Sequence, residues 1–223
     1  MKRLLITTTM LVSLGMASAS AAPIVTITGI EMPKYETLTV HVIGGYNGGA
    51  LVGQFILTTT TMGTFPGWCI DVWHDTVLGA QTGKTFDLGA ITTDSNGHVL
   101  TASQIQQIGG LINYGNAHSS TNAESAATQL AIWKIEYGNT FSWDGNPSLD
   151  AQVAALISLA PTLTGDGFAL SALNGQQTLA CGLTDCGGSG GGSSSTVPEP
   201  ASLGIIGLAL AGLRWVKRRK KAA

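Results

Sequence analysis

Cys69 is the residue of this chain whose chemistry most needs an explanation. The sequence contains three cysteines, and two of them, Cys181 and Cys186, are separated by four residues in a glycine-rich segment. In an oxidising compartment these two can form a small disulfide loop, which leaves Cys69 without a cysteine partner. An unpaired thiol outside the cell is usually buried, paired or chemically used. The cysteine pattern therefore leaves open whether Cys69 is a buried structural residue or a reactive one.

Three polar residues follow Cys69 closely. Asp71, His74 and Asp75 suggest a metal or acid-base site, and Cys69 with His74 suggests the nucleophile and base of a cysteine hydrolase. Loop acids beside a histidine are more often solvated surface groups, and the short segment supplies no third group to orient the histidine. The four histidines show no zinc-ligand spacing, and no glycine-rich loop follows a phosphate-binding pattern. We therefore predict no metal, no cofactor and no enzymatic activity.

The elements that would position these residues change in type along the chain. Before residue 93, apolar and β-branched residues alternate in short runs, which predicts strands separated by turns at Gly44-Gly45 and Asn47-Gly48-Gly49. After residue 100, apolar residues recur with a helical period. The predicted strands cover 24–30, 37–42, 50–60, 85–92 and, last, 167–180. The predicted helices cover about 104–112, 124–137 and 149–160.

This order of elements predicts an α+β fold. We expect a β-sandwich or barrel-like sheet region with an inserted or following helical subdomain, in a single exported domain over residues 23–186. Ser103, Asn122 and Ser148 are the expected N-terminal caps of the three helices. Gly138 and Pro161 are the expected stops of the second and third helices.

Two segments sixty residues apart resemble a known pair of motifs. The segment Trp68-Cys69-Ile70-Asp71 ends a predicted strand, and Ala127-Thr128-Gln129-Leu130-Ala131-Ile132-Trp133 lies in a predicted helix. Together they resemble the two signatures of bacterial thioester domains, an aromatic-Cys-Ile/Val-Asp segment and a Thr-Gln-x-Ala-Ile-Trp helix. The intervening residues 105–115 are similar to the isoleucine-rich helix of that family, which ends in Asn-x-Gly. The resemblance spans roughly residues 65–137.

The resemblance implies a covalent bond. Cys69 matches the cysteine and Gln129 the glutamine that form an internal thioester in that family, with release of ammonia, and Trp68 stands where the family often has Tyr or Phe. Such domains act as adhesins, so the implied target is a protein lysine or a polysaccharide hydroxyl on a surface or matrix molecule. His74 is the nearest residue in sequence that could assist as a base. Proximity would have to drive the reaction, since an amide is a poor acyl donor to a thiol.

The charge of the chain is unevenly distributed. Of 11 basic residues, eight lie in the segments 2–3 and 214–221, so only three basic residues face 12 acidic ones between Glu31 and Asp185. This central part carries a net charge of −9 and would repel a phosphate backbone, so we predict that no nucleic acid is bound. A charged fraction of only 11% is typical of exported β-rich proteins rather than intracellular enzymes.

The N-terminal segment predicts export. Met1-Lys2-Arg3 precedes a short apolar run and then small residues from 17 to 22. A basic start, a short apolar run and small residues at a cleavage site are typical of a secretory signal peptide, which we place at 1–22. The alternative is an N-terminal membrane anchor, for which the run is short and rich in threonine.

The C-terminal segment predicts a sorting signal. A Gly/Ser linker covers 187–196, a run of thirteen apolar residues covers 201–213, and a basic cluster follows at 214–221. The motif between linker and apolar run is Val197-Pro198-Glu199-Pro200. These parts, over 197–223, resemble the PEP-CTERM signal with its short transmembrane helix and basic tail. The alternative is a simple tail anchor.

That resemblance implies a location and a partner. It implies processing by an exosortase-type protease, transient anchoring in the inner membrane, and delivery to the cell surface or extracellular matrix of a Gram-negative-type bacterium. Three functions then compete: a thioester adhesin or anchor, a non-reactive structural surface protein associated with exopolysaccharide in which Cys69 is merely buried, and a cysteine hydrolase. We favour the thioester domain.

Overall fold

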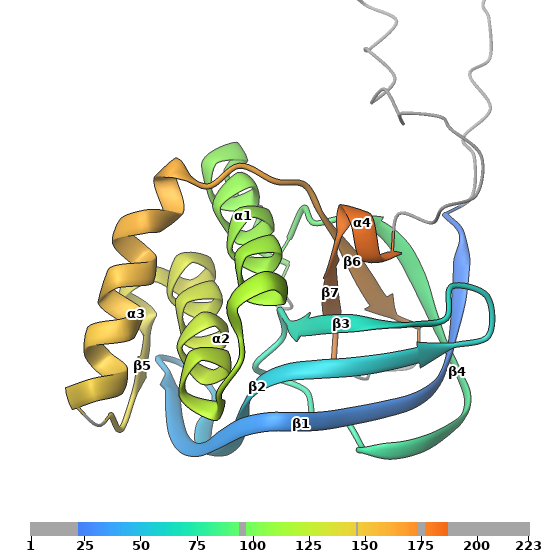
Figure 1. Cartoon of the computed structure of the whole chain (residues 1–223), viewed down its shortest axis with the longest axis horizontal. Coiled ribbons are helices and arrows are strands. Elements are labelled where there is room, and N and C mark those ends of the chain that lie inside the picture. The colour runs from blue at the N-terminus through green and yellow to red at the C-terminus, as the bar shows by residue number, and fades with distance from the viewer. Residues whose placement is uncertain (1–21, 94–96, 146, 174–176, 187–223) are drawn as a thin grey trace, which may run out of the picture. The chain divides into compact units, whose positions relative to one another are not determined.

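The computed structural model describes residues 22–93, 97–145, 147–173 and 177–186. The predicted signal peptide, apart from its last residue, the Gly/Ser linker and the sorting signal lie outside these residues. Figure 1 shows the fold of the described part, in which a curved sheet packs against helices. This arrangement confirms the predicted α+β class. Among the described residues, no helix is both long and apolar enough to cross a membrane.

The sheet contains seven antiparallel strands, all within the described residues. They are β1 (Ile24–Val42), β2 (Asn47–Thr59), β3 (Thr64–Cys69), β4 (Gly79–Ala90), β5 (Phe141–Trp143), β6 (Gly167–Ala172) and β7 (Leu179–Gly182). Their order is β2-β3-β7-β6-β4-β1-β5, and β1 also pairs with β2. The pairings of the six strands other than β5 therefore form a closed ring. Of the two predicted sheet forms, the structure adopts the barrel-like one.

Strand β1 joins two predicted strands into one of nineteen residues. One of its edges pairs with β2, while the other pairs with β4 near Ile24–Ile30 and with β5 at Val40–Val42. The register with β2 shifts between Glu31 and Lys34, next to Pro33, which has no N–H to donate to the ladder. The irregularity lets the strand continue past the proline, so the prediction of two separate strands was wrong.

The predicted turn at Asn47-Gly48-Gly49 was also wrong. These residues belong to β2 and pair with β1, because the chain reverses earlier, between Ile43 and Tyr46. The N–H of Val42 donates to the carbonyl of Tyr46 at 2.7 Å, and Gly44 takes the positive φ of 93° that this tight turn requires. Gly44-Gly45 lies in the turn that reverses the chain, whereas Gly48 and Gly49 lie inside strand β2.

The longer helices are α1 (Ala102–His118), α2 (Asn122–Tyr137) and α3 (Pro147–Leu159), and a short α4 covers Leu183–Cys186. Two 3₁₀ turns cover Gly138–Thr140 and Ala160–Thr162. The second of these contains Pro161, so the predicted stop of α3 holds. The predicted last strand over 167–180 is in fact two strands, β6 and β7, that pair with each other.

Threonines rather than the predicted residues cap the first two long helices. Thr101 and Thr121 each accept a hydrogen bond from the backbone N–H three residues later, and the side chains of Gln104 and Glu124 bond back to the cap. These reciprocal capping boxes satisfy two backbone donors each, so they outcompete Ser103 and Asn122. Helix α3 begins at Pro147, where a missing N–H costs nothing, and not after a Ser148 cap.

Helix α2 lies at the centre of the molecule's core. Ten of its sixteen residues are buried. Figure 1 shows it between α1 and α3, and its remaining side faces β1 and β2. One hydrophobic cluster contains the fully buried Trp68 of β3, Leu130 of α2 and Phe141 of β5. The sheet and the helices therefore share one core, which brings strand ends and helix faces close together.

Candidate functional site

The end of β3 and the middle of α2 meet inside this core. Cys69 is the last residue of β3, a strand held between β2 and β7, and Gln129 lies on α2. Each is only 1% exposed. The chain folds so that these two predicted thioester partners, sixty positions apart, lie side by side.

A small residue lets α2 approach the sheet. The Ser125 hydroxyl, one turn before Gln129, accepts a hydrogen bond from the N–H of Gln54 at 2.7 Å and donates to the carbonyl of Lys34 at 2.9 Å. These backbone groups flank the register shift in β1, where the ladder leaves them available. Gly53 faces the same hydroxyl, and a Cβ there would lie 2.9 Å from its oxygen. The local sequence thus fixes how closely the helix packs on the strands.

The Gln129 amide is held against the Cys69 backbone at both ends. The N–H of Cys69 donates to Gln129 Oε1 at 2.9 Å, and Gln129 Nε2 donates to the carbonyl of Cys69 at 2.8 Å. Both bonds are buried, so little water competes with them. With both heteroatoms fixed on one residue, the amide carbon between them also lies beside that residue, whose side chain carries the thiol.

The thiol itself is buried in surroundings that favour its protonated form. Cys69 Sγ donates to the carbonyl of Asp71 at 3.0 Å and accepts from the N–H of Asp71 at 3.3 Å. Burial raises the pKa of the Cys69 thiol well above its usual value, and the backbone hydrogen bond with Asp71 offsets only part of that rise. The negative charges of Asp71 and Glu136 raise the pKa of the thiol further, whereas the indole of Trp133 lowers it. A cysteine hydrolase needs a thiolate, and this environment disfavours one.

Asp71 organises the loop that follows β3. Its carboxylate accepts from the backbone N–H groups of Trp73 at 3.0 Å, His74 at 3.2 Å and Thr178 at 3.2 Å. It is 1% exposed, so the expectation of a solvated surface acid was wrong for this residue. The reason is local: a short acidic side chain at this position satisfies several backbone donors at once.

His74 completes a pair with Asp71 at the edge of the site. Its Nδ1 lies 2.7 Å from Asp71 Oδ2, and its side chain is 46% exposed. Because a carboxylate only accepts hydrogen bonds, a neutral His74 carries its proton on Nδ1 and leaves Nε2 available as a base. His74 makes no direct hydrogen bond to Cys69 in the described structure. It does border the same cavity.

A cavity of about 370 Å³ reaches Cys69 from the surface. Cys69, His74 and Trp133 are among its lining residues, whereas Gln129 is not. Within the described residues, the buried indole Nε1 of Trp133 completes no hydrogen bond, although it acts on the Cys69 thiol, whose pKa it lowers. This donor was not predicted, although its position four residues after Gln129 already put it on the same face of α2.

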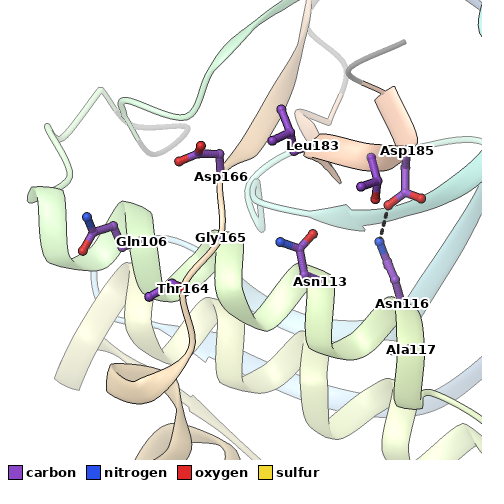
Figure 2. A pocket seen from close by; sticks show the side chains of 10 residues that line it. Gln106, Asn113, Asn116, Ala117, Thr164, Gly165, Asp166, Leu183 and Asp185 are labelled. Carbon is purple, nitrogen blue, oxygen red and sulfur yellow. Dashed lines mark hydrogen bonds between the residues drawn. The ribbon is translucent and has the colours of Figure 1, made fainter. Parts of the chain in front are cut away.

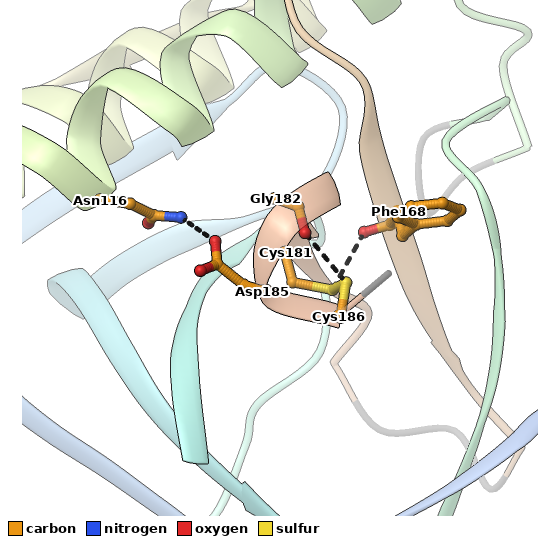
Figure 3. The surroundings of a disulfide bond; sticks show 6 residues. All are labelled: Asn116, Phe168, Cys181, Gly182, Asp185 and Cys186. Atoms are coloured by element: carbon orange, nitrogen blue, oxygen red, sulfur yellow. Dashed lines mark hydrogen bonds between the residues drawn. A yellow bond between two sulfur atoms is a disulfide. The ribbon is translucent and has the colours of Figure 1, made fainter. Parts of the chain in front are cut away.

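The other two cysteines are joined to each other. Figure 3 shows the disulfide between Cys181 in β7 and Cys186 in α4, with Cα atoms 6.0 Å apart. Cys69 is the remaining cysteine of the chain, and it is free and buried. Among the described residues, no group of three or more His, Cys, Asp or Glu side chains is arranged to hold a metal ion.

Comparison with known proteins identifies the C-terminal segment. Residues 196–220 match the family model of the PEP-CTERM protein-sorting motif. No curated protein and no solved structure matches the chain. The chain therefore carries the sorting signal of an exported protein that is directed to the cell surface and processed by an exosortase-type protease. The matched residues lie outside the described structure, and the likeness of residues 65–137 to thioester domains stays a prediction.

Proposed function

We propose that this exported domain forms an internal thioester between Cys69 and Gln129 and uses it once, as an adhesin or anchor, to attach covalently to a surface or matrix molecule. The observation that carries the proposal is the two-point hold of the Gln129 amide on the Cys69 backbone, at 2.9 and 2.8 Å. It brings a buried thiol and a buried carboxamide together from segments sixty residues apart.

Bond formation exchanges nitrogen for sulfur on the Gln129 carbonyl carbon. The Cys69 sulfur attacks that carbon, a C–S bond forms, the C–N bond breaks, and the thiol proton leaves with the nitrogen as ammonia. Both the starting pair and the product are uncharged, which suits a site where burial raises the thiol pKa. A rigid hold on both partners supplies the proximity that the reaction requires.

The same hydrogen bonds assist the attack. The Cys69 N–H donates to the Gln129 oxygen, on which negative charge develops when sulfur adds to the carbon. The carbonyl of Cys69 accepts from the nitrogen that leaves. The unpaired Trp133 N–H borders the cavity beside Cys69 and is a second donor available to the reacting atoms.

Burial preserves the bond until a partner arrives. The apolar core excludes water from Gln129, while the cavity of about 370 Å³ gives an incoming group access to Cys69. A lysine amine or polysaccharide hydroxyl attacks the acyl carbon, and the Cys69 thiol is released as the new amide or ester forms. His74, with Nε2 available, takes the proton of the nucleophile, and that proton passes on to the leaving sulfur, which becomes the Cys69 thiol.

One further function is favoured by a specific observation. The Gln129 amide satisfies both of its heteroatoms with backbone hydrogen bonds, and the Cys69 thiol has partners in Asp71. A non-reactive surface protein would use these bonds as a clamp between β3 and α2, with Cys69 merely buried. The two functions differ in covalent structure, and mass distinguishes them.

Intact-mass spectrometry of the purified exported chain tests the bond. We expect a mass one ammonia below that of the processed chain with its disulfide formed, and no such deficit in either Cys69→Ala or Gln129→Ala. Gln152→Ala, which removes an amide from α3, should keep the deficit. A full mass in the unaltered protein would establish the clamp, and a deficit that persists in Cys69→Ala would exclude the assignment.

Methylamine tests whether the bond is reactive. Incubation should add one methylamine at Gln129 and release one titratable thiol at Cys69, with peptide mapping to locate both. A mass deficit that survives methylamine without a new thiol would make the bond a structural crosslink, and the adhesin function would then be wrong.

A further inference from the structure

A second and larger cavity lies on the helical side of the molecule. It has a volume of about 740 Å³ and shares no lining residue with the cavity at Cys69. Figure 2 shows it between one face of α1, the segment at 164–166 that leads into β6, and α4. None of the functions considered above uses it.

Glycines build the centre of this cavity. Gly109 of α1 packs directly on the backbone of Gly165, where any Cβ would collide with the Gly165 carbonyl. Gly165 and Gly182 also leave the space that the Asn113 side chain occupies, because a Cβ on Gly182 would lie 2.6 Å from Asn113 Oδ1. The Asn113 amide therefore stands in the cavity, between the 164–166 segment and α4 (Figure 2).

One wall of the cavity is held rigidly. Asn116 Nδ2 donates to Asp185 Oδ2 at 2.5 Å, and Asn116 Oδ1 accepts from Trp68 Nε1 at 2.8 Å and from Gln54 Nε2 at 3.2 Å. Asp185 lies between Cys181 and Cys186 in sequence, so the disulfide restrains its backbone, and Figure 3 shows its carboxylate directed at Asn116. These groups have fixed positions before any ligand arrives, which reduces the entropy lost on binding.

Other polar groups of the lining, two of them on the same helix as Asn116, lack partners within the described residues. In the described part of the chain, the side chains of Gln106, Asn113 and Asp166 make no hydrogen bond, although all three line the cavity. Gln106 and Asn113 are seven residues apart on α1, two helical turns, and share a face. Each amide offers two donor hydrogens and an acceptor oxygen. The cavity thus offers hydrogen-bond donors and acceptors to a ligand.

The side chains that line the cavity favour one chemical class of ligand. Among the described residues, no lysine, arginine or histidine lines the cavity and two aspartates do, so phosphate, sulfate and acidic sugars are disfavoured. Asp185 already accepts from Asn116, which leaves it less suited to a cation. Hydroxyl groups both donate and accept hydrogen bonds. Two neighbouring hydroxyls can therefore bond at once to both heteroatoms of an amide or to both oxygens of a carboxylate. Leu183, 45% exposed, offers an apolar surface for C–H groups.

We propose that this cavity binds a neutral saccharide, at a site separate from the thioester. The proposal does not depend on the bond between Cys69 and Gln129. Binding here would hold a hydroxyl-rich surface or matrix polymer against the domain whether or not covalent attachment follows.

The test uses the purified exported chain after methylamine treatment, so that covalent capture cannot contribute. An array of neutral and acidic oligosaccharides identifies a neutral ligand, and calorimetric titration with that ligand measures affinity. We expect saturable binding to neutral sugars that Asn113→Ala and Gln106→Ala each weaken about tenfold, through loss of one or two hydrogen bonds. Gln107→Ala is the matched control, because its amide lies on the same helix outside the cavity and donates to Ser103.

Three results would overturn the proposal. The first is no binding to any neutral oligosaccharide on the array. The second is binding that is equally strong in the Asn113→Ala and Gln107→Ala variants, which would move the site elsewhere. The third is Ca²⁺ binding, followed by terbium luminescence, that Asp166→Asn abolishes while no sugar binds. None of these results bears on the ammonia deficit, so this proposal and the thioester fail separately.

Discussion

At the scale of single residues, the structure explains why Cys69 and Gln129 belong to one site. Sequence similarity selected them as a pair, and the fold brings the Gln129 amide within 2.9 Å of the Cys69 backbone. Without the resemblance, neither charge nor any other motif around Cys69 and Gln129 would predict that the two residues are in contact. A buried glutamine is costly unless both heteroatoms are satisfied, which is why it is directed at a strand end with free backbone groups.

Some residues of the site could not be predicted. The residue types of Asp71 and His74 already made them candidates for the site. Only the path of the chain after β3 makes Asp71 the acceptor of several backbone N–H groups. The contribution of Thr178 comes from more than one hundred residues away, so no local pattern contains it. Residues whose role depends on long-range backbone donors are the least predictable part of such a site.

Trp133 provides the sharpest prediction at this scale. Trp133→Phe keeps an aromatic ring in the core but removes the N–H, a buried donor without a partner. We expect slower or incomplete thioester formation, because a donor available to the developing negative charge is lost. Stability should change by no more than about 1–2 kcal/mol, since loss of packing is offset by removal of an unsatisfied group. Intact mass during refolding and a urea titration measure the two effects.

Trp143→Phe is the control for that experiment. Its Nε1 donates to Asp150 Oδ1 at 2.9 Å and lies outside the Cys69 cavity. This variant should form the ammonia deficit at the normal rate. Equal rates of bond formation in both variants would show that the Trp133 N–H takes no part in the reaction.

At the scale of elements, the positions of the helices were predicted better than their ends. Apolar periodicity marked all three long helices, although α2 is buried on several sides rather than on one face. The caps differed because a reciprocal capping box needs a particular partner three residues on, and Thr101 and Thr121 have one in Gln104 and Glu124. Strand β1 was less predictable, since its length depends on three different partners along two edges.

A glycine at the meeting point of three elements gives the prediction at this scale. Gly115 of α1 faces the Trp68 ring of β3 and the Thr128 methyl of α2, and a Cβ there would lie 2.5 Å and 2.6 Å from their nearest carbons. Gly115→Ala gains helix propensity of about 1 kcal/mol. We expect overpacking to outweigh this gain, with a net loss of roughly 1–2 kcal/mol of stability. Displacement of Trp68, next to Cys69, should also lower the yield of the thioester.

The control makes the same change where space is open. Gly89 lies in β4 with nothing within 4 Å of an added Cβ, and its φ is not in the left-handed region. Gly89→Ala should leave both stability and the ammonia deficit nearly unchanged. If Gly115→Ala proved as stable as Gly89→Ala in urea titrations, the close packing of α1 on Trp68 would not limit this position.

At the scale of the whole molecule, two crosslinks of different reach restrain the fold. The disulfide joins residues five apart and stays within the β7–α4 corner. The proposed thioester would join the sheet at β3 to the helices at α2 across sixty residues. In the chain-entropy model the short loop stabilises by about 2 kcal/mol at most and the long one by about 4 kcal/mol. If the proposed thioester forms, it would therefore supply most of the stability gained from crosslinking.

Comparison of the chain before and after methylamine isolates this effect, because opening the bond keeps both side chains in place. Urea unfolding, followed by tryptophan fluorescence, should show a loss of up to about 4 kcal/mol on opening. The slope of the transition should also steepen, since an unlinked unfolded chain exposes more surface. Reduction of the disulfide with a phosphine, which avoids thiol attack on the thioester, should cost no more than about 2 kcal/mol. Identical transitions for the treated and untreated chain would mean that no long crosslink restrains the unfolded state, and that hydrogen bonds alone join Gln129 to Cys69.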